Sequence, residues 1–175
     1  MQLFICRICG DPILGDEKPY NCPFCGAKSK YIVPISQYQD YELKELIGIS
    51  RKNLEESLKL EIDNTQFYTC ISKSSSNFEI QKLFKALAKV EWEHASMVCK
   101  MLGIKKPPLE EKDTCFNSDK KNLQDFQRRE KLAVERYSKF ANEATEQKVK
   151  VSFHALVEVE SDHLAISKEE LKKFE

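Results

Sequence analysis

The sequence predicts a mainly α-helical protein, an antiparallel four-helix bundle with one long crossover, preceded by a small N-terminal metal-binding module. Three observations favour this fold class. The chain has five Gly and six Pro among 175 residues, and long Lys-, Glu- and Leu-rich tracts follow residue 42. The second half of the chain repeats a pattern of the first half, and the first forty residues contain two Cys-x-x-Cys pairs. We therefore expect two domains, at residues 1–40 and 41–175.

Composition and charge exclude several classes of protein. Lys+Arg and Asp+Glu both number 28, so the net charge is zero and we expect neither nucleic acid nor a membrane as a partner. The apolar runs are shorter than the roughly 20 residues that a membrane-spanning helix needs. The first residues, MQLFICRICG, have no basic segment before an apolar stretch, so we expect no signal peptide. Seven Cys in such a chain indicate thiols and metal ligands in a reducing cytoplasm, and not a disulfide framework.

The motifs CRICG and CPFCG predict a metal site in the first domain. They supply Cys6 with Cys9 and Cys22 with Cys25, and twelve residues separate the two pairs. Two residues between thiols allow a tight turn to direct both sulfurs at one ion, and the glycine after each pair suits that turn. Four thiolates favour zinc or iron, and a module with so little core needs its metal to fold. A structural zinc site and a one-electron iron site have the same ligands, so both interpretations stay open.

An internal duplication is the most informative pattern in the second domain. Each half has a Glu, a Tyr seven residues later, and a Glu-x-x-His motif that begins thirty residues after the first Glu. Moving Glu91 forward by 69 residues gives Glu160, and the same offset relates every other member, which indicates a duplicated unit. The first set is Glu61, Tyr68, Glu91 and His94, and the second set is Glu130, Tyr137, Glu160 and His163.

These spacings place the acidic residues on the inward faces of the predicted helices. Apolar residues recur at steps of three and four between Phe84 and Met101, and Glu91 and His94 stand in the middle of that stripe. Four buried carboxylates repel one another and lose their hydration unless cations lie among them. Two metal ions supply that charge. One Glu from each of two helices and Glu-x-x-His from each of the other two form a known di-metal ligand set, which suits iron or manganese better than zinc.

Other side chains receive more general interpretations. Tyr68 and Tyr137 either donate hydrogen bonds to the ligating carboxylates or fill the core. His154 lies beside the inward stripe and is interpreted as structural or surface, and Trp92 as a packing residue. Three cysteines that lack a Cys-x-x-Cys partner are interpreted as small buried hydrophobic residues: Cys70, Cys99 and Cys115.

The connections fit an antiparallel bundle with one crossover. The short break SSSN (74–77) makes the first two helices antiparallel neighbours, and the last two join near TEQK (145–148). The segment 103–120 is long and contains two successive prolines, so we expect it to cross over between the second and third helices.

With these motifs, the chain resembles a rubrerythrin over nearly its whole length, a rubredoxin-like CRICG…CPFCG module joined to a ferritin-like bundle. The module comes first, so the order resembles that of the reverse rubrerythrins. The resemblance implies that Cys6, Cys9, Cys22 and Cys25 bind one iron, with zinc as the alternative. It also implies a catalytic di-iron centre, with manganese or zinc as alternative metals and Glu91 and Glu160 bridging. Its ligands would be Glu61, Glu91, His94, Glu130, Glu160 and His163.

The sequence departs from the commoner rubrerythrins at one position. Those proteins carry a further Glu three residues after the third-helix ligand, and one iron moves between that Glu and a His. Here the position is Ala133, and Glu135, five residues beyond Glu130, faces away from the stripe. The six-ligand set is therefore similar to that of bacterioferritin-type centres, and the resemblance does not extend to the iron movement.

The resemblance implies a cytoplasmic non-haem di-iron peroxidase of oxidative-stress defence. It would reduce hydrogen peroxide with electrons relayed through the four-cysteine iron from a reductase or a rubredoxin. In the family, the module of one subunit can approach the bundle of another, so we expect a homodimer. Alternatives are an oxidase or ferroxidase that uses dioxygen, and a non-redox iron-binding protein with a structural zinc ribbon. Nucleic-acid binding by the ribbon is disfavoured because its basic residues are few: Arg7, Lys18, Lys28 and Lys30.

Overall fold

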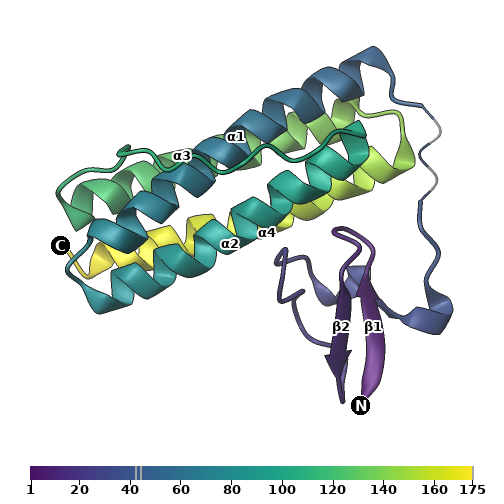
Figure 1. The fold of residues 1–175 in the computed structure, drawn as a ribbon, viewed down its shortest axis with the longest axis horizontal. Coiled ribbons are helices and arrows are strands. Elements are labelled where there is room, and N and C mark those ends of the chain that lie inside the picture. The colour runs from purple at the N-terminus through teal and green to yellow at the C-terminus, as the bar shows by residue number, and fades with distance from the viewer. Residues whose placement is uncertain (42, 44, 175) are drawn as a thin grey trace.

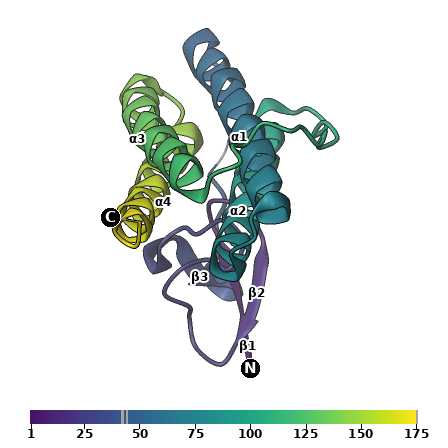
Figure 2. The same ribbon diagram turned by 90° about the vertical axis from the view of Figure 1, so that its left-hand side faces the viewer.

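The computed structural model describes residues 1–41, 43 and 45–174, a small β-containing module followed by four long helices (Figure 1, Figure 2). The predicted fold class, a mainly α four-helix bundle with an N-terminal module, is confirmed. The helices are α1 (Gly48–Ser74), α2 (Phe78–Leu102), α3 (Asp119–Glu143) and α4 (Gln147–Lys172). Residues 42, 44 and 175 of the predicted second domain lie outside the described residues. None of the helices in the described part of the chain has the length and apolarity needed to span a bilayer.

The module is built on an antiparallel sheet in which β1 is central, in the order β2-β1-β3. Leu3 pairs with Leu14 across one side of β1, and Ile5 pairs with Val33 across the other. Two 3-10 turns flank the third strand. The elements are β1 (Gln2–Cys6), β2 (Pro12–Gly15), η1 (Ser29–Tyr31), β3 (Ile32–Pro34) and η2 (Ile35–Gln37).

Local sequence signals set the helix ends. The Asn77 side chain accepts hydrogen bonds from two N–H groups of the first turn of α2, and Ser118 accepts one at the start of α3. Gly103 ends α2 in the left-handed conformation, at φ 68°. Helix α1 has no such local cap. Instead, the carboxylate of Glu146, just before α4, accepts the N–H of Ile47 at 2.5 Å, so the N-termini of α1 and α4 meet there.

The helices form two antiparallel hairpins, α1 with α2 and α3 with α4, and α1 also contacts α3. The crossover between α2 and α3 runs back along α1, as the thin teal and green segment in Figure 1 shows. The predicted short connections at 74–77 and 145–148 are confirmed, because α2 begins at Phe78 and α4 at Gln147.

The bundle core consists of two apolar clusters. One cluster lies near the junction of α1 and α2 and includes Tyr68, Phe84 and Phe126. The other includes Tyr137 and Phe153 and continues into the module, where it contains all four cysteines of the Cys-x-x-Cys pairs. The acidic side chains and histidines of the duplicated pattern belong to neither cluster, although they are buried.

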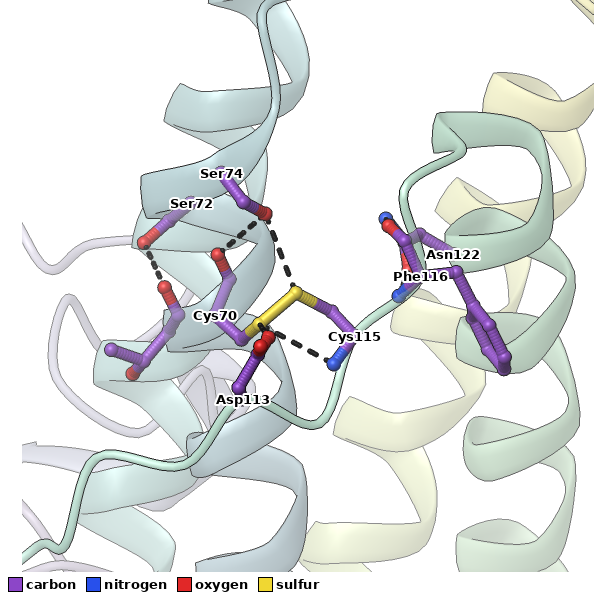
Figure 3. The surroundings of a disulfide bond; sticks show 8 residues. Cys70, Ser72, Ser74, Asp113, Cys115, Phe116 and Asn122 are labelled. Carbon is purple, nitrogen blue, oxygen red and sulfur yellow. Dashed lines mark hydrogen bonds between the residues drawn. A yellow bond between two sulfur atoms is a disulfide. The ribbon is translucent and has the colours of Figure 1, made fainter.

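The crossover is attached to α1 by a disulfide bond between Cys70 and Cys115 (Figure 3). The expectation of free thiols, and of Cys70 and Cys115 as ordinary buried hydrophobic residues, is therefore wrong for this pair. The two cysteines are 45 residues apart, and only the return of the crossover along α1 brings their Cα atoms to 5.8 Å. Local spacing carries no signal of that path. Cys99 is a free, buried cysteine, as expected.

The module lies against α2 and α4 of the same chain. Lys28 forms an ion pair with Asp162, and Lys30 forms one with Glu158. Gly26, at φ +72°, lies so close to α4 that a Cβ atom would be 3.0 Å from Val159 Cγ1. Gly26 therefore permits both the left-handed turn and the close approach of the module to the bundle.

Replacement of Gly26 tests this packing, with Gly10 as a matched control. Gly10 has the same left-handed conformation, at φ +83°, but nothing lies within 4 Å of its added Cβ. Each Ala variant costs about 1–2 kcal/mol of backbone strain in the module, and only Gly26→Ala also displaces the module from α4. We expect acetylation of Lys28, followed by mass spectrometry, to be faster in Gly26→Ala than in Gly10→Ala. Equal Lys28 labelling in the two variants would contradict this account.

Candidate metal centres

The four cysteines of the module lie together with the geometry of a single-ion site. The Cys6 and Cys25 sulfurs are 3.7 Å apart, and those of Cys9 and Cys22 are 3.8 Å apart. All four are at most 3% exposed, and their sulfurs lie within 4.8 Å of one another. A tetrahedral ion with bonds of about 2.3 Å to sulfur separates its ligands by about 3.8 Å. The donor set therefore fits one zinc or iron ion.

Backbone hydrogen bonds shape both cysteine turns. The N–H of the glycine after each pair donates to the carbonyl of the first cysteine, at 2.9 Å from Gly10 to Cys6 and 3.0 Å from Gly26 to Cys22. Each turn thereby directs its two sulfurs to the same side. This is the local arrangement that the Cys-x-x-Cys-Gly spacing predicts.

The bundle holds two overlapping groups of potential ligands. In each group one donor atom per residue lies within 4.8 Å of the others. Glu91 and Glu160 belong to both groups, as two carboxylates shared by a pair of metal ions would. The structure thus brings together all six side chains that the sequence nominated. One group is Glu61, Glu91, His94 and Glu160, and the other is Glu91, Glu130, Glu160 and His163.

Each histidine directs its Nδ1 atom at three carboxylates. His94 Nδ1 is 3.3 Å from Glu160, 3.4 Å from Glu91 and 3.6 Å from Glu61. His163 Nδ1 is 3.0 Å from Glu160, 3.1 Å from Glu91 and 3.8 Å from Glu130. The two halves of the duplication therefore meet as two similar donor sets around one centre.

Unpaired buried atoms show that this centre suits cations. Among the described residues, several buried ligand-type atoms have no hydrogen-bond partner, at a cost that proteins rarely accept. Six of them belong to the two ligand groups of the bundle, where positive ions would coordinate them. These atoms are Glu61 Oε2, Glu91 Oε1 and Oε2, His94 Nδ1, Glu130 Oε2 and Glu160 Oε1.

The surroundings alter the proton affinity of the ligand-type groups. Burial raises the pKa of Glu61 and of Glu130 well above the usual value, and neighbouring carboxylates add to the effect. Burial alone would lower the pKa of His94 and of His163. However, attraction to Glu61 and Glu160, respectively, and to the other carboxylates raises the pKa of both well above the usual value. Without metal, the centre therefore retains protons at neutral pH.

Two buried tyrosines orient the outer carboxylates in a crossed arrangement. Tyr68 on α1 donates its hydroxyl hydrogen to Glu130 on α3, and Tyr137 on α3 donates to Glu61 on α1. Both interpretations of these tyrosines are confirmed, because each donates to a candidate ligand carboxylate and each belongs to an apolar cluster of the core. Because each bond joins opposite halves of the duplication, the pair also fixes α1 against α3. His154 is exposed, as the surface interpretation expects.

A hydrogen bond links the two candidate centres. His94 Nε2 lies 2.9 Å from the backbone carbonyl oxygen of Cys25. Lys100, also on α2, donates to the carbonyl oxygen of Cys9 at 2.9 Å. Sequence reasoning missed both contacts, because they depend on where the module docks, which no local spacing encodes.

The fold and the two donor sets define a class, the ferritin-like four-helix bundles that carry a rubredoxin-like module. Comparison with known proteins identifies the family: the model of the rubrerythrin family matches residues 52–171, and the chain belongs to that family. It is also 27% identical, over 114 residues, to reverse rubrerythrin-1 of Clostridium acetobutylicum. That match covers 59% of this chain and 63% of the length of the relative. The cysteine module precedes the helices here, which is the reverse order.

Metal binding to the bundle centre should release protons, because raised pKa values keep ligand groups protonated in its absence. Calorimetric titration of manganese in two buffers of different ionisation heat should therefore give different heats at about pH 7. The apparent affinity should fall about tenfold per pH unit of acidification for each proton released. Glu135→Gln, at an exposed position outside the centre, should not change the release. Heats independent of the buffer would contradict the prediction.

Proposed function

We propose that this protein is a non-haem di-iron oxidoreductase of oxidative-stress defence. In this proposal it reduces hydrogen peroxide with electrons that pass through a four-cysteine iron. The observation that carries the proposal is the 2.9 Å contact between His94 Nε2 and the carbonyl oxygen of Cys25. It joins a ligand-type residue of one centre to a ligand-type residue of the other within a single chain. Membership of the rubrerythrin family supports iron as the metal.

Two ferrous ions at the bundle centre would supply the pair of electrons that cleaves an O–O bond. The protein contributes the arrangement around them. Glu91 and Glu160, which belong to both donor groups, would help to hold both ions. Tyr68 and Tyr137 hold the outer carboxylates in position through their hydroxyl groups. The six ligand-type residues are at most 6% exposed, so bulk water is excluded from the reacting oxygens.

Reduction of one hydrogen peroxide to two waters consumes two electrons and two protons, whereas a four-cysteine iron carries one electron. An iron held by the module would therefore have to deliver an electron twice in each cycle, and the contact between the Cys25 carbonyl and His94 would connect it to the bundle centre. Its donor is a one-electron carrier, such as a reductase or a rubredoxin. Because the proposed relay lies within one chain, it operates equally in a monomer and in the expected cytoplasmic homodimer.

The surroundings of Ala133 favour a second candidate function, the reduction of dioxygen by an oxidase or ferroxidase. Ala133 is 2% exposed and lies in an apolar cluster, so α3 offers no further carboxylate there. Glu135 is exposed and cannot replace it. The remaining six-ligand set resembles bacterioferritin-type centres, which supports dioxygen as the alternative oxidant.

Anaerobic stopped-flow spectroscopy tests the choice between oxidants. The iron-reconstituted, fully reduced protein is mixed with equal concentrations of hydrogen peroxide or dioxygen, and the absorbance of the oxidised four-cysteine iron is followed. We expect this colour to develop at least about tenfold faster with peroxide, a difference in barrier of about 1.4 kcal/mol.

Other outcomes would replace the proposal. Faster oxidation by dioxygen would favour the oxidase or ferroxidase. An absence of thiolate colour with both oxidants, despite full iron loading of the bundle, would indicate zinc in the module. The relay would then be excluded and the non-redox iron-binding alternative favoured.

A further inference from the structure

We propose that Cys70 and Cys115 form a second redox site, a reversible dithiol–disulfide couple that exchanges electrons with a dithiol reductant. This couple joins α1 to the crossover and uses none of the candidate ligands of the two centres described above. The inference is independent of the oxidant proposed above for the bundle. It rests on a cavity beside one sulfur, a hydroxyl beside the other, and the way in which the crossover is attached.

The two sulfurs have different surroundings. Cys70 lines an open cavity of about 310 Å³ between α1 and residues 109–113 of the crossover. Cys115 instead packs against the apolar cluster around Phe67 and Phe126. An incoming thiol can therefore approach Cys70 from the cavity, and Cys115 becomes the leaving group.

Groups around the disulfide can support each step of the exchange (Figure 3). The hydroxyl oxygen of Ser74 is 3.3 Å from Cys115 Sγ and also donates to the carbonyl of Cys70 at 2.9 Å. When Cys115 leaves as a thiolate, the Ser74 hydroxyl group can rotate and donate its hydrogen to that sulfur. The charged thiolate accepts a stronger hydrogen bond than the neutral carbonyl of Cys70 does. The Asp113 carboxylate lies 3.6 Å from Cys70 Sγ, where it can accept the proton of the attacking thiol.

The exchange balances as a two-electron, two-proton transfer. The first thiolate of the reductant forms a bond to Cys70 Sγ as the Cys70–Cys115 bond breaks, and Cys115 leaves with the electron pair. The second thiol of the reductant then attacks the first sulfur of the reductant, which is bound to Cys70. This attack breaks the mixed disulfide and releases Cys70. The backbone N–H of Cys115, 3.3 Å from Cys70 Sγ, can donate to that thiolate. The reductant ends as a disulfide, and both cysteines end as thiols.

Reduction has a defined structural consequence for the crossover. Besides the disulfide, an exposed ion pair between Lys73 and Glu111 attaches this segment to α1, and exposed pairs of this kind hold weakly. The far end of the segment is attached separately, because the Asn122 side chain bonds both the N–H and the carbonyl of Phe116, at 2.8 and 2.9 Å. Near its start, Lys106 donates to Ser96 Oγ and to the Trp92 carbonyl oxygen of α2, contacts that do not depend on the disulfide. Reduction therefore releases residues 107–115 and leaves both the start of the segment and the start of α3 in place.

The test uses the full chain with zinc in its metal sites, so that the metal-site cysteines stay protected. The protein is equilibrated anaerobically with mixtures of reduced and oxidised dithiothreitol, and free thiols are alkylated and located by mass spectrometry. We expect Cys70 and Cys115 to interconvert reversibly in the folded protein. Limited proteolysis should show faster cleavage within residues 107–115 after reduction, and Cys70→Ser should be cleaved as fast as the reduced protein.

Ser74→Ala and Ser72→Ala form a matched pair for the reduction kinetics. Ser72 lies on the same turn of α1, and its hydroxyl group donates to the backbone carbonyl of Thr69 at 2.8 Å instead of contacting a sulfur of the disulfide. We expect Ser74→Ala to slow reduction about tenfold, the effect of losing one hydrogen bond to a charged sulfur, and Ser72→Ala to leave the rate unchanged.

Three results would overturn the proposal. The first is a pair that remains oxidised until the protein unfolds, and the second is a pair that does not re-form with oxidised dithiothreitol. The third is equal reduction rates in the two serine variants together with unchanged proteolysis of the crossover.

Discussion

The constraint on which the structure depends is the burial of four carboxylates and two imidazoles in one layer of a small bundle. Two apolar clusters enclose this layer and remove the water that would otherwise solvate it. Mutual repulsion among the acidic groups is then relieved only by retained protons or by bound metal ions. The crossed tyrosine bonds, the antiparallel hairpins and the docking of the module all surround this layer and restrict its geometry.

The sequence was sufficient to predict this layer because the information is periodic. Glu91 and His94 interrupt an apolar stripe, and the offset of 69 residues repeats the interruption at Glu160 and His163. Helical geometry then converts sequence spacing into a shared face. The cysteine turns were predictable for a similar reason, since two residues between thiols fix a local geometry. In both cases each side chain is positioned by its own element.

The features that the sequence did not reveal depend on the paths of long segments. The disulfide requires the crossover to return along α1, and Cys70 and Cys115 carry no local mark of that route. The contact between His94 and the Cys25 carbonyl requires the module to dock on its own bundle. Gly26 was read as a turn residue, yet it also provides the space for that docking beside Val159. Such contacts emerge from packing between elements, which periodicity does not describe.

The docked module breaks the symmetry that the duplication gives to the bundle. His94 and His163 are equivalent in the repeat, but among the described residues only His94 has its outer nitrogen against a backbone carbonyl. A hydrogen bond to that carbonyl makes the His94 imidazole a more basic ligand than its counterpart. Two ions held by matching donor sets would therefore differ in reduction potential. The bundle centre thus has two unlike sides, one that faces the module and one that does not, although the two halves share one repeated pattern.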